Sequence, residues 1–295
     1  MTERNLSISF LGCGNMGRAM LQGLLDALNP LNPTNSTSKS PFSFTACTAT
    51  ETSARSLIEE LGRHQQRVRV LHGENKKAIE GADVVILGIK PYMAAKVLED
   101  PDIREALKGK FVISMLAGID VATLRQLIIG EASENAETTH VAKAIPNIAA
   151  RYRQSITVLE ESTPALPEEK RELLQWIFDQ VGRTKFLPTN LVNVGTVLNT
   201  AFLSTLSIPL EGLLDGSVAQ GLKRKDAFEM AAQGVRGFAA MLENGLHPAI
   251  MREDISSPRG CTIQTLMTVE KAATRATFAQ ALINGVEHLE KPTKK

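Results

Sequence analysis

Cysteine is scarce in this sequence, and the three that are present, Cys13, Cys47 and Cys261, lie far apart. No two of them have the close spacing of a metal site, and an odd, scattered set does not make a disulfide framework. We therefore expect no bound metal and a reducing, cytoplasmic location. The first strand-like pattern begins within a few residues of Met1, so no signal peptide is expected either.

An excess of charge of one sign is also missing, because 33 lysines and arginines face 32 aspartates and glutamates. This balance argues against a nucleic-acid partner. No apolar run approaches the roughly 20 residues of a membrane-spanning helix, so no membrane partner is expected. Hydrophobic residues nevertheless make up 43% of the 295 residues, which is enough for the core of one large domain or of two medium ones.

The first two-thirds of the chain alternates strand-like apolar runs with helix-like periodicity. Such alternation predicts a Rossmann-type α/β fold, in which helices cover both faces of a doubly wound, mostly parallel sheet. Strands are expected at residues 6–11, 42–48, 68–71, 83–88, 110–115, 141–145, 155–159 and 184–187. Helices are expected at residues 16–28, 52–61 and 168–181.

Two segments depart from this alternation. Residues 29–40 are rich in Asn, Pro, Ser and Thr and are expected to form a surface loop. After about Pro188 the strand patterns stop and long apolar-periodic stretches replace them. These stretches predict helices at residues 191–221, 225–244 and 274–289. The sequence thus predicts a dinucleotide-binding domain at residues 1–188 and an all-helical domain at residues 189–295.

A G-x-G-x-x-G motif follows the first predicted strand and opens the first predicted helix. Its residues are Gly12, Cys13, Gly14, Asn15, Met16 and Gly17. In this context the first glycine allows a tight turn, the second lets a pyrophosphate approach the backbone, and the third lets helix and strand pack closely. The N-terminus of the helix then offers free N–H groups to the phosphates. The alternative, a purely structural glycine-rich turn, fits this placement less well.

The end of the second predicted strand distinguishes NAD from NADP, since an acidic residue there binds the ribose 2′-hydroxyl of NAD. Thr48 and Thr50 are instead small neutral donors, and Arg55 follows one helical turn later. This arrangement admits a 2′-phosphate, so it favours NADPH and places Thr48 in the cofactor site. Glu51 fills the acidic role if the strand runs longer, which leaves NADH open.

Two further dipeptides lie where ligands bind in such sheets, at the carboxyl ends of strands. Lys90 and Pro91 follow the strand expected at 83–88, and Ala117 and Gly118 follow the next one. Ala117 and Gly118 are small enough for a nicotinamide ring to lie against them.

Several pieces of sequence now fit together. They are FLGCGNMG at 10–17, Asn75 within GENKKAIEGADV, GIKP at 88–91, SMLAG at 114–118 and HPAIMREDISSPRGCTI at 247–263. With them the chain resembles the pyrroline-5-carboxylate reductase family, which makes proline by reducing a cyclic imine, over nearly its whole length. The last piece is the most specific, because the family has a Ser/Thr-Pro-Gly-Gly-Thr/Ala-Thr-Ile segment there.

The resemblance implies roles for individual residues at the cofactor. Asn75 would bond the adenosine ribose, Lys90 and Pro91 would line the cofactor cleft, and Ala117 and Gly118 would flank the nicotinamide.

The resemblance also implies a catalytic residue and a partner. Thr262 would reach the imine nitrogen of the substrate from a second subunit, because the helical domains of this family intertwine as dimers. A homodimer, or a larger homo-oligomer built from dimers, is therefore expected. Arg259, Gly260 and Cys261 would line the substrate pocket beside Thr262.

The chain departs from the family at three places around the substrate. Residues 199–205 read NTAFLST where the family has a Ser-Gly-Ser-Gly-Pro-Ala stretch that holds the substrate carboxylate with backbone N–H groups. Arg259 stands at the first glycine of Pro-Gly-Gly, and residues 146–149 read PNIA in place of Pro-Asn-Thr-Pro. Asn199 or Arg259 could supply a new contact to an anionic group of the substrate.

These departures leave several functions open. The chain reduces 1-pyrroline-5-carboxylate, or a substituted pyrroline carboxylate of a specialised pathway, or it retains the nucleotide site as a sensor without turnover. A hydroxy-acid dehydrogenase of related architecture is a further alternative. That class usually has a catalytic lysine within the helical domain, whereas Lys223 and Lys225 here follow the long helix.

Overall fold

A computed structural model describes residues 6–28, 42–130, 138–161 and 163–291. Within these residues eight strands form one sheet in the order β3-β2-β1-β4-β5-β6-β7-β8. All neighbouring strands are parallel except the antiparallel pair β6 and β7. The strands are β1 (Leu6–Leu11), β2 (Phe42–Thr48), β3 (Val68–His72), β4 (Val84–Leu87), β5 (Phe111–Ser114), β6 (His140–Ile145), β7 (Ser155–Glu161) and β8 (Gly182–Pro188). The predicted mostly parallel sheet is confirmed, and each expected strand is present.

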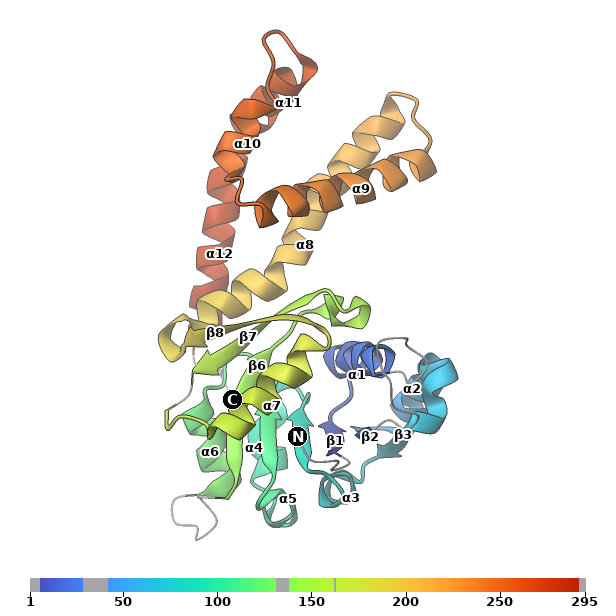
Figure 1. The fold of residues 1–295 in the computed structure, drawn as a ribbon, viewed down its shortest axis with the longest axis vertical. Helices are drawn as coiled ribbons and strands as arrows, with labels where there is room; N and C mark the ends of the chain where they lie inside the picture. Colours follow the sequence, from blue (N-terminus) through green and yellow to red (C-terminus); the bar gives the residue numbers. More distant parts are fainter. Residues whose placement is uncertain (1–5, 29–41, 131–137, 162, 292–295) are drawn as a thin grey trace. The chain divides into compact units, whose positions relative to one another are not determined.

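Helices cover both faces of this sheet (Figure 1). The three that were predicted are α1 (Asn15–Ala27), α2 (Glu51–Leu61) and α7 (Glu168–Asp179). Four short ones that the sequence did not reveal are α3 (Asn75–Glu80), α4 (Ala94–Leu98), α5 (Pro101–Leu107) and α6 (Val121–Ile129). Short 3-10 helices complete the connections at η1 (Gly62–Arg67), η2 (Pro91–Met93) and η3 (Ile148–Tyr152). The loop expected at residues 29–40 lies outside the described residues.

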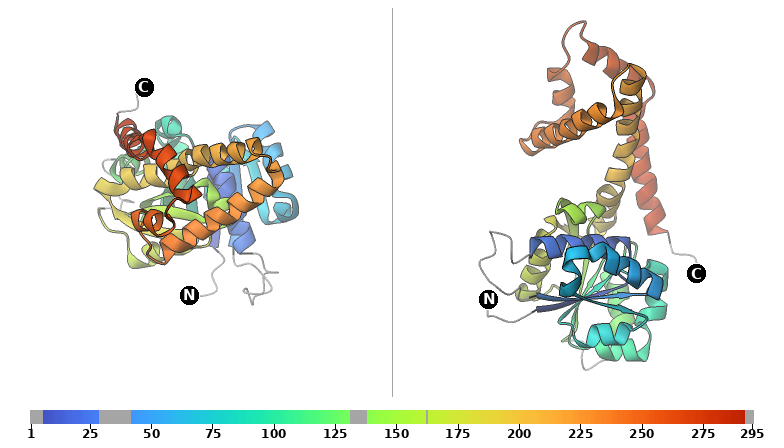
Figure 2. Two further views of the ribbon diagram at one scale, coloured as in Figure 1. Left: turned by 90° about the horizontal axis from the view of Figure 1, so that it is seen from above. Right: turned by 90° about the vertical axis from the view of Figure 1, so that its right-hand side faces the viewer.

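Side chains alternate across each central strand and so build two separate cores. On β1, Ile8 and Phe10 pack with α1, α2 and α7, whereas Leu11 packs on the other face with α3–α6. Figure 2 (right) shows α1 and α2 on one side of the sheet and the helices of the 75–129 region on the other. Strands buried on both faces read as continuous apolar runs, which is why these strands were readable in the sequence.

The C-terminal part contains only helices among its described residues. They are α8 (Thr189–Ala219), α9 (Arg224–Glu243), α10 (Pro248–Asp254), α11 (Cys261–Lys271) and α12 (Thr274–Glu290). The chain forms two compact units, one of residues 1–200 with 286–295 and the other of residues 201–285. The first turns of α8 and the last turn of α12 therefore group with the sheet in these compact units, and the domain division predicted at residue 188 stays a prediction.

Helix α8 is long and apolar enough to cross a membrane by length and composition alone, with a mean hydropathy of 1.4 over 18 residues. This differs from the expectation that no apolar run reaches such a length. Pro209 lies inside the helix, where it cannot donate a backbone hydrogen bond.

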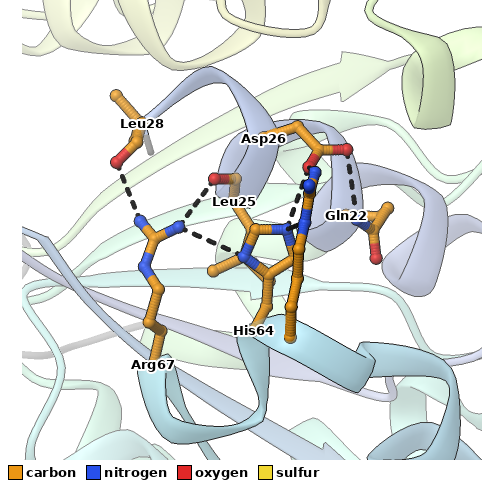
Figure 3. Close-up of polar contacts among 7 residues, drawn as sticks. Gln22, Leu25, Asp26, Leu28, His64 and Arg67 are labelled. Carbon is orange, nitrogen blue, oxygen red and sulfur yellow. Dashed lines mark hydrogen bonds and ion pairs between the residues drawn. The ribbon is translucent and has the colours of Figure 1, made fainter. Parts of the chain in front are cut away.

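The C-terminal end of α1 is held by charged side chains of η1 (Figure 3). The Arg67 guanidinium donates to the carbonyl oxygens of Leu25 (2.7 Å) and Leu28 (2.8 Å), which the helix itself leaves without partners. Asp26 lies beside it and is 2.9 Å from the Nε2 of the buried His64. A cation at this end also interacts favourably with the helix dipole. These contacts fix the helix whose other end forms the glycine loop.

We predict that Asp26→Asn destabilises the fold by about 1–2 kcal/mol near neutral pH, because a carboxylate with charged partners is lost. Burial alone would raise the pKa of Asp26, but hydrogen bonds from Gln22, Arg63 and His64 hold it below its ordinary value of 3.8. A lowered pKa contributes stability above the unfolded pKa and loses it as pH falls through the folded one. In urea unfolding the difference from wild type should therefore be constant at neutral pH and shrink as the pH falls below about 5, towards the lowered pKa of the folded state. The exposed Glu169→Gln is the control, and a difference that is constant with pH would contradict the assignment.

Candidate functional site

The glycine loop between β1 and α1 is built on close backbone contacts. Gly12 has φ of 83°, and a Cβ atom there would lie 2.7 Å from the backbone nitrogen of Ile89. Gly88 approaches the same loop, since its Cβ would be 2.6 Å from the carbonyl oxygen of Gly12. The backbone N–H groups of Gly12 and Cys13 both donate to the carbonyl oxygen of Cys47 on β2, at 3.0 Å. Only glycine fits at positions 12 and 88, and the loop is fixed between three strands.

The second glycine, in contrast, faces open space. No atom lies within 4 Å of a Cβ built on Gly14. Gly14 is the N-cap of α1, and it has no side chain that could cap the N–H groups of Asn15, Met16 and Gly17. The first turn of α1 contains no acidic residue that would repel an anion. An uncapped helix N-terminus with space in front of it is suited to bind a phosphate group.

Cys13 lies within this loop but does not supply chemistry. Its side chain is buried, and burial raises the pKa of its thiol to about 12. A protonated, buried thiol is a poor nucleophile. The role of Cys13 is to pack in the core beneath the loop.

The end of β2 holds the residues expected at the adenosine. Thr48 is buried, and its hydroxyl lies 3.0 Å from the carbonyl oxygen of Thr50, to which it donates. Thr50 caps α2 by accepting a hydrogen bond from the backbone of Ser53. Thr48 therefore shapes the turn, and a direct contact from its hydroxyl to a 2′-phosphate stays a prediction. Asn75, the first residue of α3, accepts a hydrogen bond from the Cys47 thiol and so lies at the end of the same strand.

Two exposed charges considered for cofactor choice neutralise each other. Arg55 and Glu51 form an ion pair at 2.6 Å on the surface of α2. Such exposed i,i+4 pairs contribute little and open easily. Either side chain can therefore rearrange toward a ribose, and the pair selects neither NAD nor NADP by itself.

The predicted residues at the next two strand ends lie at the carboxyl edge of the sheet. Lys90 is exposed after β4, and its Nζ lies 5.9 Å from the ring centre of Tyr92. Pro91 opens η2 beside it. Ala117 and Gly118 follow β5, with Gly118 at a φ of 76°. Since β1, β4 and β5 are neighbours, these residues and the glycine loop lie along one edge of the sheet.

Asn199 takes part in a buried network that ties α8 to the end of β6. It accepts a hydrogen bond from the side chain of Asn147 (2.8 Å) and donates one to the carbonyl oxygen of Ile145 (2.8 Å). Asn147 also accepts from the backbone of Ala149, and its own backbone N–H donates to Ser155. Sequence reasoning treated Asn147 only as part of a departure and missed this role. The network positions Asn199, whose predicted contact to substrate stays a prediction.

The stretch 199–205 runs within the continuous helix α8. Hydroxyl groups there bond back to the helix, as Thr200 does to the carbonyl oxygen of Thr196 and Thr205 to that of Ala201. Backbone N–H groups inside a helix are already used by the i−4 carbonyls. The stretch that lacks the family's glycines and proline is therefore a regular helix. Such a helix offers no backbone anion site at this position.

The segment before α11 retains a tight turn despite its substitution. Arg259 has φ of 59°, a left-handed conformation that explains why a glycine suits this position. Gly260 is the N-cap of α11, and a Cβ there would collide with the side chain of Ser257. Cys261 and Thr262 are the first residues of the helix, and the exposed Cys261 is a free thiol. The Thr262 hydroxyl has no hydrogen-bond partner among the described residues, so it is available to a ligand.

Two family models match the chain. The first, described as pyrroline-5-carboxylate reductase dimerisation, matches residues 189–291. The second, described as NADP oxidoreductase, coenzyme F420-dependent, matches residues 7–118. The dimerisation match contains all of α8.

Curated relatives have the same family name. The chain is 35% identical to pyrroline-5-carboxylate reductase of Lophium arboricola, with 94% of this chain and 90% of the relative aligned. It is 34% identical to the enzyme of that name from Schizosaccharomyces pombe, with 92% and 94% aligned. The Plasmodium falciparum pyrroline carboxylate reductase structure with NADP bound has a TM-score of 0.78 at 20% identity, covering 97% of this chain and 98% of that one. That structural likeness supports the fold.

Substitutions at Gly14 and Gly12 are expected to have opposite effects, one on cofactor binding and the other on stability. Gly14→Val should leave the melting temperature close to wild type, because a Cβ built on Gly14 has no atom within 4 Å and faces open space. It should weaken NADPH binding by roughly tenfold or more, since it fills the space that a phosphate would take. Gly12→Ala should instead lower the melting temperature, because its Cβ collides with Ile89. Cofactor fluorescence titration and thermal unfolding of both variants measure this, and a Gly14→Val protein with wild-type affinity would contradict the phosphate site.

Proposed function

The chain belongs to the pyrroline-5-carboxylate reductase family, and we propose that it reduces 1-pyrroline-5-carboxylate to proline with NADPH. The observation that carries this proposal is an alignment that spans both parts of the chain, from the glycine loop to the Thr262 segment. A sensor that retained only the nucleotide site would not need the Thr262 segment, whose turn and free hydroxyl are kept.

The residues of the nucleotide-binding unit fit NADPH. The uncapped first turn of α1 and the open space at Gly14 suit its pyrophosphate, and Asn75 lies at the strand end where the adenosine ribose is expected. Ala117 and Gly118, at the carboxyl end of β5, are small residues against which the nicotinamide can lie. When bound, NADPH supplies the hydride that reduces the C=N bond and is itself oxidised to NADP⁺. The chain has to position the imine carbon at reacting distance and favour the protonated iminium.

Thr262 is the residue that we assign to the proton. Its hydroxyl lies in the first turn of α11, where the positive end of the helix dipole and free N–H groups face outward. From there it can hold a proton, directly or through one water molecule, at the substrate nitrogen as that nitrogen becomes an amine. No histidine or carboxylate has to act as a base, because the nitrogen only gains a proton.

Replacing Thr262 tests this role. Thr262→Ala should lower kcat by roughly 10²-fold, the lower end of what a positioned proton donor contributes, and leave NADPH affinity unchanged. Thr265→Ala is the matched control, since its hydroxyl bonds to the carbonyl oxygen of Cys261 within the same helix. Steady-state kinetics with 1-pyrroline-5-carboxylate measure both, and unaltered turnover in Thr262→Ala would exclude the assignment.

The choice among imines is the finer part of the proposal. The helical stretch at 199–205 has no backbone anion site, so the substrate carboxylate needs another partner. Arg259, exposed before α11, provides a guanidinium that binds carboxylates with two parallel hydrogen bonds. Comparing 1-pyrroline-5-carboxylate with alkyl-substituted pyrrolines and six-membered cyclic imines tests specificity. A preference for an imine without a carboxylate would exclude this role of Arg259.

A homo-oligomer follows from the match to the dimerisation model. Large apolar side chains are exposed on the helical unit, among them Ile208 (70%), Phe228 (63%) and Met230 (67%). Soluble monomers seldom expose so much apolar surface, whereas subunit interfaces bury it. We propose a dimer, or a larger assembly built from dimers, in the cytoplasm. Cell fractionation would test the location.

Charge placed on this surface should separate the subunits. Ile208→Glu is expected to shift the protein from dimer to monomer in light scattering, because burying an unpaired carboxylate opposes association. Activity should fall with it if Thr262 acts on a neighbouring subunit. Gln66→Glu, an equal change of charge on η1, is the control. A dimer that persists unchanged in Ile208→Glu would place the interface elsewhere.

A further inference from the structure

A cavity lies in the sheet-containing unit, lined by residues other than those of the glycine loop. It has a volume of about 320 Å³ and lies between the end of the sheet, the first turns of α8 and the last turn of α12. Lys143 of β6 and Glu160 of β7 line it, together with the exposed Asp120 at the start of α6. Asn193 and Val192 add a polar and an apolar wall. The cavity is large enough for a small organic molecule.

Lys143 and Glu160 are charged residues that are buried beside this cavity. Each is only 3% exposed, and neither side chain makes a hydrogen bond or ion pair with the described residues. Burial lowers the pKa of Lys143, while Glu160 and Asp120 act in the opposite direction. Charged groups in protein interiors are nearly always paired, because an isolated one costs several kcal/mol. Lys143 and Glu160 interact electrostatically without a direct contact, so a ligand in the cavity can bond to both of them.

The two side chains lie opposite each other without meeting. In the antiparallel register of β6 and β7, Ala144 pairs with Leu159 and Ile145 with Val158, and its continuation sets Lys143 against Glu160. Directly opposed residues have Cβ atoms about 5 Å apart, close enough for an ion pair. Since no such pair forms, the ammonium and the carboxylate remain available to the cavity that both residues line.

We propose that this cavity binds a small zwitterion of the α-amino-acid class, with its carboxylate at Lys143 and its ammonium group at Glu160 and Asp120. One molecule of this class would contact both buried charges at once, whereas a simple anion or cation would contact only one of them. Glu290 and Lys291 also line the cavity and add one charge of each sign. Asn193 can add a hydrogen bond, and Val192 with Leu289 provides an apolar wall for a side chain.

A ligand in this cavity would lie next to the loop that is expected to contact the cofactor. Gly118, expected beside the nicotinamide, lies at the rim, and a Cβ on it would be 3.2 Å from Leu289 of α12. The same loop leads to Asp120, which caps α6 by accepting from the backbone of Thr123. A ligand held by Asp120 would therefore restrict the loop at 117–120. We expect it to alter NADPH affinity.

Calorimetric titration of the whole protein, saturated with NADPH, tests the site with glycine, L-alanine, L-leucine and L-proline as probes. At least one should bind saturably, and acetate and methylammonium should bind more weakly, because each meets one charge only. Lys143→Met and Glu160→Gln should each weaken that binding by roughly tenfold or more. The matched controls Lys185→Met and Glu161→Gln change exposed neighbours and should bind as wild type does.

The outcomes distinguish binding in this cavity from binding at the catalytic site, and from a cavity that holds only water. Glycine, L-alanine and L-leucine are not products of the proposed reaction, so their binding does not depend on that proposal. If Lys143→Met fails to fold, as thermal unfolding would show, Glu160→Gln and the cavity-filling Asn193→Leu still test the site. The proposal is overturned if no probe binds saturably, because the cavity would then hold only water. It is overturned equally if acetate binds as tightly as the amino acids do. It is also overturned if binding survives Glu160→Gln and Asn193→Leu unchanged.

Discussion

The nucleotide-binding half of this protein depends on one backbone contact, the approach of the Gly12 loop to the turn at Gly88 and Ile89. Neither position has room for a side chain, and the contact lies where β1 and β4 are neighbours at the centre of the sheet. The tight turn aims α1 so that its first N–H groups face open space at Gly14. At its other end the helix is held by Arg67. The proposed phosphate site is thus a consequence of packing, and it offers the uncapped end of α1 to an anion.

Much of the fold was readable from the sequence because the central strands are buried on both faces. Continuous apolar runs such as that at 84–87 have few alternatives, and the long helices repeat their apolar positions over many turns. The short helices α3–α6 were missed because five to nine residues give too little periodicity. The point at which the two compact units divide gives no signal in the sequence, since α8 continues through it without any break in pattern.

The residues of the candidate site were predictable where the backbone conformation dictates the residue type. They were less predictable where a role depends on which hydrogen-bond partner a side chain finds. The glycines at 12, 14 and 17 lie where their spacing required. Thr48 and Asn199 instead turn out to be engaged in the protein's own hydrogen bonds, and no local pattern shows which partner a buried hydroxyl or amide will take. Lys143 and Glu160 were invisible for a related reason, because only the antiparallel register of β6 and β7 sets them against each other. The register of distant strands is a property of the folded sheet.

The most direct test of the central claim is the stoichiometry of the reaction with the purified protein. NADPH and 1-pyrroline-5-carboxylate are incubated with it, and the NADPH consumed is compared with the proline formed. A reductase of this family predicts one molecule of proline for each NADPH oxidised, with no oxidation when the imine is omitted. Tight NADPH binding without proline formation would contradict the account and favour a nucleotide sensor.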